Sequence, residues 1–418
     1  MKHALIVAFH FPPEASSSGV LRTLKYARYL EEYGWRVTVI TLKRSAYLIT
    51  DPKLEEQIPK SAHVVRTRYI NVKRHLAIRG RYPAILAVPD TWSGWWPWAV
   101  TAGNAAIARE RPDIIYSTSP HATAHLIAGH LARRWKLPWV VDFRDPWFED
   151  PPEPDTPAIV HWFARRLEAK VVARADHIVA STKHLKEMLV ARYLRESPTK
   201  FSVIPNGYDE ADFKALSEQP YAKQRQLTIV HTGSVNADFR DPRPLFRAIR
   251  TAADQGLLDV STLSLRFIGG GTFGESAEML QCLNETGLQQ TVSFLPRVSY
   301  DEVIKELGHA DIALLLQAST DTAALVPAKL YEYLRSQKPV LALVNPGASQ
   351  ELISETAGGW AIEPCDHKGL TAVIVEIYRL WDSGELIHKG ASLHAVEQYS
   401  RQNLTGALAD IFNSLTSK

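Results

Sequence analysis

Short apolar runs that alternate with amphipathic stretches are the feature that most limits how this chain of 418 residues can fold. The amphipathic stretches, for example residues 21–33 and 123–135, have helical spacing. Strands read as continuous apolar runs when helices cover both faces of a parallel sheet. The alternation therefore predicts a doubly wound, parallel α/β sheet. The predicted strands of the first half are residues 4–9, 37–41, 114–116, 139–141, 178–180 and 201–204.

The same pattern starts again after a turn signal at Asn206-Gly207. The chain is long enough for two cores, because single cores stop growing near about 250–300 residues. We therefore expect two Rossmann-like domains, residues 1–205 and 206–397, that face each other across a cleft. The amphipathic segment 398–418 is expected to complete the first domain. The predicted strands of the second domain are residues 227–231, 265–268, 292–295, 312–316 and 340–343.

Composition narrows the class of protein. The net charge of +3 does not indicate a nucleic-acid partner, but it suits phosphorylated ligands or anionic lipid. Two cysteines, Cys282 and Cys365, are too few for a disulfide framework and favour a reducing cytoplasm. Residues 4–9 are too short for a signal-peptide core, and no segment approaches the ~20 apolar residues of a membrane span. We expect a cytoplasmic protein whose membrane contact, if any, is peripheral.

The segment from Val326 to Val340 carries the strongest chemical signal. Pro327 suits the first turn of a helix, which places Lys329 in that turn. Glu332 follows one turn later on nearly the same face. A lysine for phosphate and a carboxylate for ribose hydroxyls are what a nucleoside diphosphate requires. An ordinary amphipathic helix with a solvated Lys–Glu pair has the same spacing and is the more common case.

Glycines and arginines follow other predicted strands of the second half. Ligands of doubly wound sheets bind at the carboxyl ends of the strands. Glycine there permits a close approach of the backbone, and arginine can bind phosphate oxygens in a fork. A solvated surface arginine in a charged loop is the alternative for Arg240. The candidates are Gly233, Ser234 and Arg240 after the first of these strands, Gly270 after the second and Arg297 after the third.

The first half has its own candidates at strand ends. Small residues lead to Gly19 at a predicted helix start, where backbone N–H groups can approach an anion. Asp142, Arg144 and Asp145 follow a buried strand, where they bind substrate or where Arg144 pairs with either aspartate to fix the loop. His121 follows another strand. His125 is four residues further along, but no third ligand accompanies the two histidines, so we expect no metal site.

Residues 74–98 are rich in arginine and tryptophan. A basic surface with tryptophans is typical of an interfacial patch on an anionic membrane. The same composition also fits core packing or an apolar wall for an acceptor. The residues concerned are Arg74, Arg79, Arg81, Trp92, Trp95, Trp96 and Trp98.

Taken together, these motifs resemble the retaining glycosyltransferases of family 4, the group 1 glycosyltransferases with the GT-B fold. The resemblance covers nearly the whole chain and is most specific at residues 142–147, 203–209 and 326–340. Residues 9–13 and 117–121 are similar to a subgroup that builds bacterial surface polysaccharides.

The resemblance implies a function. The expected enzyme moves a sugar from a nucleotide-diphosphate donor, with a UDP-sugar as first choice, to a glycan or lipid-linked acceptor, and needs no metal or other cofactor. Basic side chains would stabilise the charge that develops on the leaving diphosphate. The expected partners are the donor, the acceptor and an anionic membrane at the inner face of the plasma membrane.

The resemblance also implies roles for single residues. Arg240 and Lys329 would neutralise the diphosphate and Glu332 would bind the ribose. His121 and Asp145 would face the acceptor or the transferred sugar. Those five residues form the predicted catalytic set. The predicted donor-binding set is Gly19, Gly233, Ser234, Arg240, Gly270, Arg297, Lys329, Leu330 and Glu332.

One position departs from the family pattern. The family pairs Glu332 with a second glutamate eight residues earlier, where this chain has Ala324. Asp321, or the backbone of residues 322–325, is the candidate replacement. The alternatives to a glycosyltransferase are a catalytically degenerate scaffold that binds nucleotide sugars, which Ala324 motivates, and a GT-B epimerase or hydrolase.

Overall fold

The computed structural model describes residues 1–17, 19–79, 81–148, 156–214, 225–269, 271–318 and 323–417. The chain forms two compact units. The first unit is Met1–Asn206 together with Arg401–Lys418, and the second is Gly207–Ser400. In the part of the chain described, no helix is both long and apolar enough to cross a bilayer.

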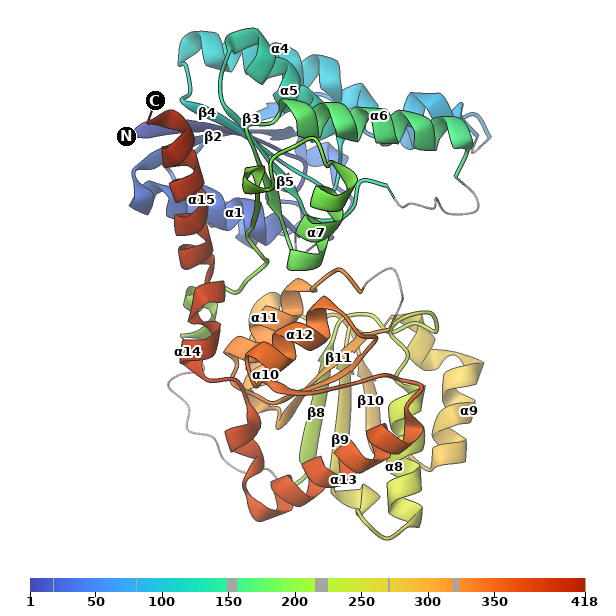
Figure 1. The fold of residues 1–418 in the computed structure, drawn as a ribbon. Helices are drawn as coiled ribbons and strands as arrows, with labels where there is room; N and C mark the ends of the chain where they lie inside the picture. The colour runs from blue at the N-terminus through green and yellow to red at the C-terminus, as the bar shows by residue number, and fades with distance from the viewer. Residues whose placement is uncertain are drawn as a thin grey trace. The chain divides into compact units, whose positions relative to one another are not determined.

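The first unit is built on a parallel sheet with the strand order β3-β2-β1-β4-β5-β6-β7 (Figure 1). Central strand β1 pairs with β2 on one side and β4 on the other, so that Ile6 lies opposite both Val39 and Tyr116. The strands are β1 (Lys2–Ala8), β2 (Trp35–Leu42), β3 (His63–Thr67), β4 (Ile114–Thr118), β5 (Trp139–Phe143), β6 (His177–Ala180) and β7 (Phe201–Val203).

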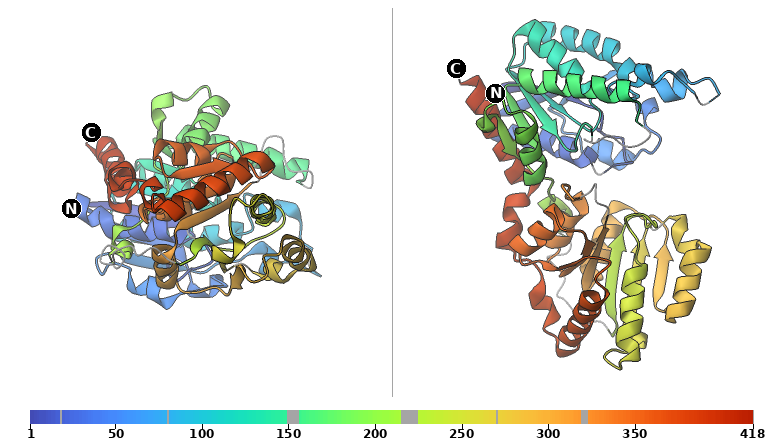
Figure 2. Two further views of the ribbon diagram at one scale, coloured as in Figure 1. Left: turned by 90° about the horizontal axis from the view of Figure 1, so that it is seen from below. Right: turned by 45° about the vertical axis from the view of Figure 1, so that its right-hand side comes forward.

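Helices cover both faces of this sheet, so the central strands are apolar on both sides. Leu5 and Val7 of β1 belong to the core under α4 and α5, whereas Ala4 and Ile6 belong to the core under α1 and α15. The turned views in Figure 2 show helices on the two sides. The helices are α1 (Gly19–Tyr29), α2 (Pro52–Glu56), α3 (Val72–His75), α4 (Trp96–Arg109), α5 (Thr123–Trp135), α6 (Ala158–Arg174), α7 (Lys183–Arg192) and α15 (Arg401–Thr416).

Helix α15 brings the end of the chain back to the first unit. Its Phe412 packs edge-on against Trp35 of β2, and Leu408 is fully buried. Lys2 donates a hydrogen bond to Thr416 Oγ1 at 2.9 Å, so both termini lie side by side (Figure 1). Of the amphipathic segment 398–418, the part from Arg401 on forms α15, which closes the core beside α1.

The second unit repeats the architecture with the strand order β10-β9-β8-β11-β12-β13. All of its strand pairs are parallel, which confirms the predicted pair of doubly wound α/β domains. The strands are β8 (Leu227–Thr232), β9 (Leu263–Ile268), β10 (Val292–Leu295), β11 (Ile312–Gln317), β12 (Val340–Val344) and β13 (Gly359–Ile362).

Two layers of helices sandwich this sheet as well. Helices α8, α9 and α13 cover one face, and α10, α11 and α12 cover the other. Helix α10 begins with a capping box, in which Ser299 and Glu302 satisfy each other's backbone N–H groups. The helices are α8 (Arg243–Asp254), α9 (Ala277–Thr286), α10 (Tyr300–His309), α11 (Ala328–Arg335), α12 (Ala348–Glu355), α13 (His367–Ser383) and α14 (Leu393–Val396).

Candidate functional site

Glycines end two neighbouring strands of the second unit at the carboxyl edge of the sheet. Gly233 follows β8 with φ +113° and Gly269 follows β9 with φ +80°, backbone conformations that glycine tolerates best. A Cβ on Gly269 would lie 3.8 Å from the Cα atoms of Gly233 and Arg297. The edge therefore brings Gly233, Gly269 and the backbone of Arg297 together, as expected for a ligand-binding end of a doubly wound sheet.

Lys329 lies over this glycine edge. It is the second residue of α11, and its ammonium donates a hydrogen bond to the carbonyl of Thr232. A Cβ on Gly233 would stand 2.7 Å from Lys329 Nζ, so the glycine makes room for the lysine. Burial, and next the charge of Arg240, lower the pKa of Lys329 to about 7, whereas Glu332 raises it. The Lys329 ammonium therefore has too little negative charge nearby to offset its burial and the charge of Arg240.

Arg240 is the second cation at the edge. Its Nη1 donates to Ser234 Oγ at 2.9 Å, and its guanidinium lies 4.9 Å from the centre of the Phe239 ring. Partial burial lowers its pKa. The structure thus brings together Arg240, Lys329, Gly233 and Ser234, which the sequence analysis singled out separately.

Glu332 lies one helical turn beyond Lys329 and is 7% exposed. Tyr300, at the start of α10, donates a hydrogen bond to Glu332 Oε1 at 3.0 Å and so orients the carboxylate. Leu330 also belongs to the predicted donor-binding set, and its side chain is fully buried in the apolar core. Its N–H donates to the carbonyl of Pro327 at 3.0 Å. Gly270, Asp321 and Thr322 lie outside the described residues.

A cavity of about 260 Å³ opens beside the loop that carries Arg240. Phe239 and Asn345 line it together with the acidic side chains of Asp238 and Asp241, whereas Lys329 and Glu332 do not. Carboxylates repel a diphosphate, so the cavity suits an uncharged part of a ligand better than its phosphates.

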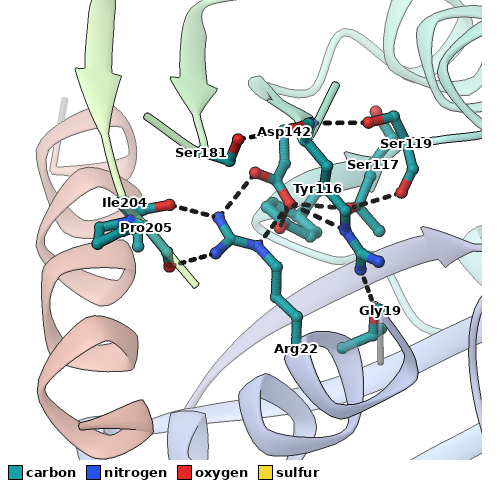
Figure 3. A network of polar contacts seen from close by, with 12 residues as sticks. Gly19, Arg22, Tyr116, Ser117, Ser119, Asp142, Ser181, Ile204 and Pro205 are labelled. Carbon is teal, nitrogen blue, oxygen red and sulfur yellow. Dashed lines mark hydrogen bonds and ion pairs between the residues drawn. The ribbon is translucent and has the colours of Figure 1, made fainter. Parts of the chain in front are cut away.

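In the first unit, Asp142 forms the centre of a buried polar network (Figure 3). Arg22 of α1 binds it with two hydrogen bonds, from Nε at 2.9 Å and from Nη2 at 2.8 Å. The hydroxyls of Tyr116 and Thr118 donate to Asp142 Oδ2 at 2.6 and 2.7 Å. Burial raises the pKa of Asp142, but these donors together hold it below its ordinary value. The aspartate is therefore a structural anion.

Arg22 also fixes the last segment of the unit. Its Nη1 donates to the carbonyl of Pro205 at 2.6 Å and its Nη2 donates to the carbonyl of Ile204 at 2.8 Å. In Figure 3 these carbonyls lie on the side of the guanidinium away from Tyr116. Sequence analysis missed this role of Arg22, because its partners are more than 100 residues away along the chain.

Arg144 forms an ion pair with Asp142, one of its predicted alternatives, but at a longer distance than Arg22 does. Its Nε lies 3.9 Å from Asp142 Oδ2 and donates a hydrogen bond to Thr118 Oγ1 at 2.9 Å. Its Nη2 donates to Thr23 Oγ1 at 3.0 Å, and its backbone N–H donates to Ser119 Oγ at 2.8 Å. Arg22 makes the direct hydrogen bonds to the carboxylate, whereas the hydrogen bonds of the Arg144 side chain go to threonine hydroxyl groups.

His121 and Asp145 lie in a second, mostly buried group. The His121 ring packs 4.1 Å from the Phe9 ring and stacks 5.7 Å from His10. Burial lowers the pKa of His121 to about 3 and raises that of Asp145. His10 Nδ1 is paired with Glu14 Oε2 at 2.7 Å, a buried contact that the sequence analysis did not recognise. His121 is therefore a neutral imidazole at physiological pH.

His125 belongs to the core and not to a site shared with His121. Its Nδ1 is 2.9 Å from Ser117 Oγ, and its ring packs near Phe143. Helix α5 begins at Thr123, so only His125 lies within the helix and the spacing of four does not align the two rings. Within the described ranges, no three His, Cys, Asp or Glu side chains are grouped as metal ligands would be.

Two domain families match the chain. Residues 19–207 match the glycosyl transferase 4-like domain, and residues 240–391 match the glycosyl transferases group 1 domain. The chain belongs to the GT-B glycosyltransferases. In this GT-B glycosyltransferase the first match begins at Gly19 and contains the Asp142 network, and the second contains Arg240, Lys329 and Glu332. No curated protein sequence matches the chain significantly.

Solved structures share the fold of this GT-B glycosyltransferase. A glycosyltransferase from Rickettsia africae ESF-5 is 16% identical, with a TM-score of 0.68 over 99% of this chain and 98% of that one. Anabaena HepE in complex with UDP is 16% identical, with a TM-score of 0.66 over 99% and 100%. Sucrose-phosphate synthase from Thermosynechococcus elongatus is 14% identical, with a TM-score of 0.62 over 100% of both chains. At such identities the likeness establishes the fold alone.

Asp142→Asn is expected to destabilise the first unit by ~3–5 kcal/mol, because it leaves a buried guanidinium without its counter-ion. Urea denaturation followed by intrinsic fluorescence measures the loss. The lowered pKa of Asp142 has a further consequence: its stabilisation is present above about pH 4 and is lost as the pH falls through the folded-state pKa.

The control is Glu110→Gln, which removes the partner of Arg36 from a partly exposed pair and should change stability little. If Asp142→Asn matched the wild type in stability at pH 7, the structural role of the network would be wrong.

Proposed function

We propose that this enzyme transfers a sugar, with retention of configuration, from a nucleotide diphosphate to a glycan or lipid-linked acceptor. The observation that carries the proposal is the meeting of Lys329 and Arg240 over Gly233. Two cations, one of them with a pKa lowered to about 7, are held where a ligand of a doubly wound sheet binds. A bound diphosphate would supply negative charge to balance Lys329 and Arg240.

The same cations explain how the transfer would be accelerated. When the bond between sugar and diphosphate breaks, negative charge grows on the departing phosphate oxygen. Fixed donors at that point stabilise the transition state more than the ground state. Lys329 is fixed by Thr232 and Arg240 by Ser234, so neither has to reorganise during the reaction. We propose that these two residues replace a metal ion in this role.

Glu332 and the glycine edge would hold the nucleoside. Tyr300 orients the Glu332 carboxylate, which is proposed to accept a hydrogen bond from a ribose hydroxyl. The peptide groups beside Gly269 and Arg297 are proposed to meet the base. We propose UDP as the nucleotide, a choice that the occurrence of UDP in complexes with Anabaena HepE supports.

The first unit would supply the acceptor side. Gly19 is proposed to lie beside the diphosphate, with His121 and Asp145 facing the acceptor or the transferred sugar. Since the pKa of His121 is about 3, it would act as a neutral hydrogen-bonding group and not as an imidazolium. Surface-polysaccharide synthesis in the bacterial cytoplasm is the proposed setting, on the basis of the motifs at residues 9–13 and 117–121.

Ala324 keeps a second function open. A scaffold that binds nucleotide sugars without turnover would retain Lys329 and Arg240 but lack the sugar contact that the family's first glutamate provides. An epimerase or hydrolase would act on the donor alone. Assays of donor hydrolysis and of transfer to added acceptors separate these functions, because the scaffold does neither.

We also propose peripheral contact with an anionic membrane through the described residues of the segment 74–98. The side chains of Leu76, Ile78, Ile85, Leu86 and Trp96 are exposed there, next to exposed Lys73, Arg74, Arg79 and Arg81. Exposed apolar groups beside cations suit a headgroup region. The other tryptophans of the segment are less exposed than Trp96. Trp95 is fully buried, and its Nε1 donates a hydrogen bond to Thr67 Oγ1 at 2.7 Å.

Lys329→Met and Arg240→Gln should each weaken UDP binding on the order of ten- to a hundred-fold, the usual worth of a charge-assisted hydrogen bond of ~1.5–3 kcal/mol. Isothermal titration calorimetry with UDP measures this. Arg247→Gln removes an exposed arginine of the same unit and should bind UDP as the wild type does. Unchanged affinity in both test variants would mean that the diphosphate binds elsewhere.

Binding of UDP at pH 8 should take up a proton. With a pKa of about 7, Lys329 is mostly neutral at that pH, and a diphosphate beside it raises the pKa so that the lysine becomes charged. Calorimetry in Tris and in HEPES, buffers with different ionisation enthalpies, counts the protons. Uptake should vanish at pH 6 and in Lys329→Met. Equal enthalpies in the two buffers at pH 8 would contradict the assignment.

Ile78→Ser combined with Leu86→Ser should reduce flotation with vesicles that contain anionic lipid, because both apolar side chains would be removed from the interface. Leu194→Ser is the control, since Leu194 is an exposed apolar residue of the first unit outside the patch. Absence of flotation of the wild type at low salt would reject membrane contact through this surface.

A further inference from the structure

The cavity beside the Arg240 loop contains none of the residues that are proposed to bind the donor. All the residues that line it belong to the second unit. They come from the loop after β8, from the ends of β11 and β12, and from the segment after β13. The volume of about 260 Å³ is just below the ~300–1,000 Å³ of pockets that enclose drug-sized ligands, so the cavity suits a single ring.

Two hydrogen bonds hold one wall of the cavity in place. Asn345 Nδ2 donates to the carbonyl of Ala318 at 3.0 Å, and the N–H of Ala318 donates to the carbonyl of Phe239 at 2.9 Å. These bonds connect the end of β12, the end of β11 and the loop after β8. A wall that is already fixed does not have to become ordered when a ligand binds, which lowers the entropic cost of binding.

The polar side chains of the cavity offer mainly acceptors. Asn345 uses its amide nitrogen on Ala318, and its Oδ1 is an acceptor by nature. Both oxygens of Asp241 accept from Arg243 Nε at 2.9 Å, and a carboxylate has further lone pairs for other donors. Asp238 adds an exposed carboxylate. A ligand that satisfies these groups therefore has to bring several donors.

The charges around the cavity favour a neutral ligand. Arg243 pairs with Asp241 at 2.8 Å and so balances one of the two carboxylates. Asp238 is exposed, where water and salt screen its charge. A phosphate would be repelled, and a nucleobase has too few N–H groups for three acceptors. Hydroxyl groups are donors without charge.

The rest of the lining is apolar. Phe239, Leu316 and Leu343 contribute to it. A sugar ring has hydroxyl groups around its rim and C–H groups on its faces. The face of an aromatic ring is negatively polarised and attracts such C–H groups. A sugar ring therefore matches both the acceptors and the apolar part of this cavity.

We propose that the cavity is a second carbohydrate site, which binds one neutral sugar ring of a glycan. The hydroxyl groups of the ring donate to Asp238, Asp241 and Asn345. Its C–H groups pack against Phe239. The site is separate from the proposed donor site and holds a glycan chain on the second unit. The inference goes beyond the proposed function and does not require that UDP binds.

Two variants change the cavity at exposed positions, where the fold tolerates substitution. Asp238→Ala removes an acceptor, and Ala237→Trp fills the cavity from its rim. Asp382→Ala, at an exposed aspartate of α13 outside the cavity, is the control. Thermal melting identifies a variant that fails to fold, and if Ala237→Trp does so, Asp238→Ala still tests the proposal.

Saturation-transfer difference NMR measures binding of the methyl glycosides of glucose, galactose, mannose, rhamnose and N-acetylglucosamine. At least one should bind to the wild type and to Asp382→Ala. Its affinity should fall about ten-fold in Asp238→Ala, which loses a hydrogen bond to a charged group, and binding should be lost in Ala237→Trp. Absence of binding by all five, binding confined to cationic methyl glucosaminide, or wild-type affinity in both cavity variants would overturn the proposal.

Cys365 shows where the sugar binds. It lines the cavity and is exposed, whereas Cys282 is buried. Alkylation of native enzyme with iodoacetamide, followed by mass spectrometry, measures the reaction rate of Cys365. The sugar at about ten times its Kd should slow alkylation about ten-fold, because only the free fraction of the enzyme reacts. An unchanged rate would place the sugar elsewhere and overturn the proposal.

Failure of the proposed function gives a different result. If the wild type bound no UDP, the donor site would be rejected. The sugar titrations and the alkylation of Cys365 contain no nucleotide, so they would still decide whether the cavity binds a sugar.

Discussion

The pairing of Arg22 with Asp142 is the interaction on which the carboxyl edge of the first unit's sheet depends. One guanidinium connects α1, β5 and the carbonyls of Ile204 and Pro205, three segments that are far apart in sequence. Parallel strands end with backbone groups that need partners, and this arginine satisfies two of them. Because Arg22 makes the direct hydrogen bonds to Asp142, the neighbouring Arg144 lies further from the carboxylate, at 3.9 Å, and is hydrogen-bonded to threonine hydroxyl groups.

The second unit also holds a buried cation at the edge of its sheet, and there a glycine provides the space for it. Gly233 leaves the volume in which Lys329 lies, and Tyr333 fixes Thr232, whose carbonyl holds the ammonium. Burial, and next the charge of Arg240, lower the pKa of Lys329. Holding two cations in place costs stability. This is typical of sites where fixed groups stabilise the charge of a ligand without moving. Both units hold fixed positive charge next to a glycine, since Arg144 lies beside Gly19 in the first.

The sequence predicts the fold well where strands are buried on both faces, because these read as apolar runs. It misses β3 and β13, short edge strands whose residues are mostly only partly buried. Lys329, Arg240 and Gly233 could be proposed from their places after strands. The partners of Arg22 and the buried His10–Glu14 pair could not, since tertiary structure alone brings the Arg22 partners close and nothing in the spacing signals a buried ion pair. Leu330 was predicted from its place beside Lys329, but neighbouring residues on a helix face about 100° apart, so the Lys329 side chain reaches the edge while that of Leu330 enters the core.

The return of the chain in α15 has a consequence for biosynthesis. Trp35, Tyr116 and Ile6 form an apolar face that α15 covers with Leu408 and Phe412. A ribosome delivers those covering residues last, after the whole of Gly207–Ser400 has emerged. The first unit therefore begins to be synthesised before the second, but its core is completed only when α15 has been made. Until then a nascent chain exposes an apolar surface that chaperones or proteases can recognise.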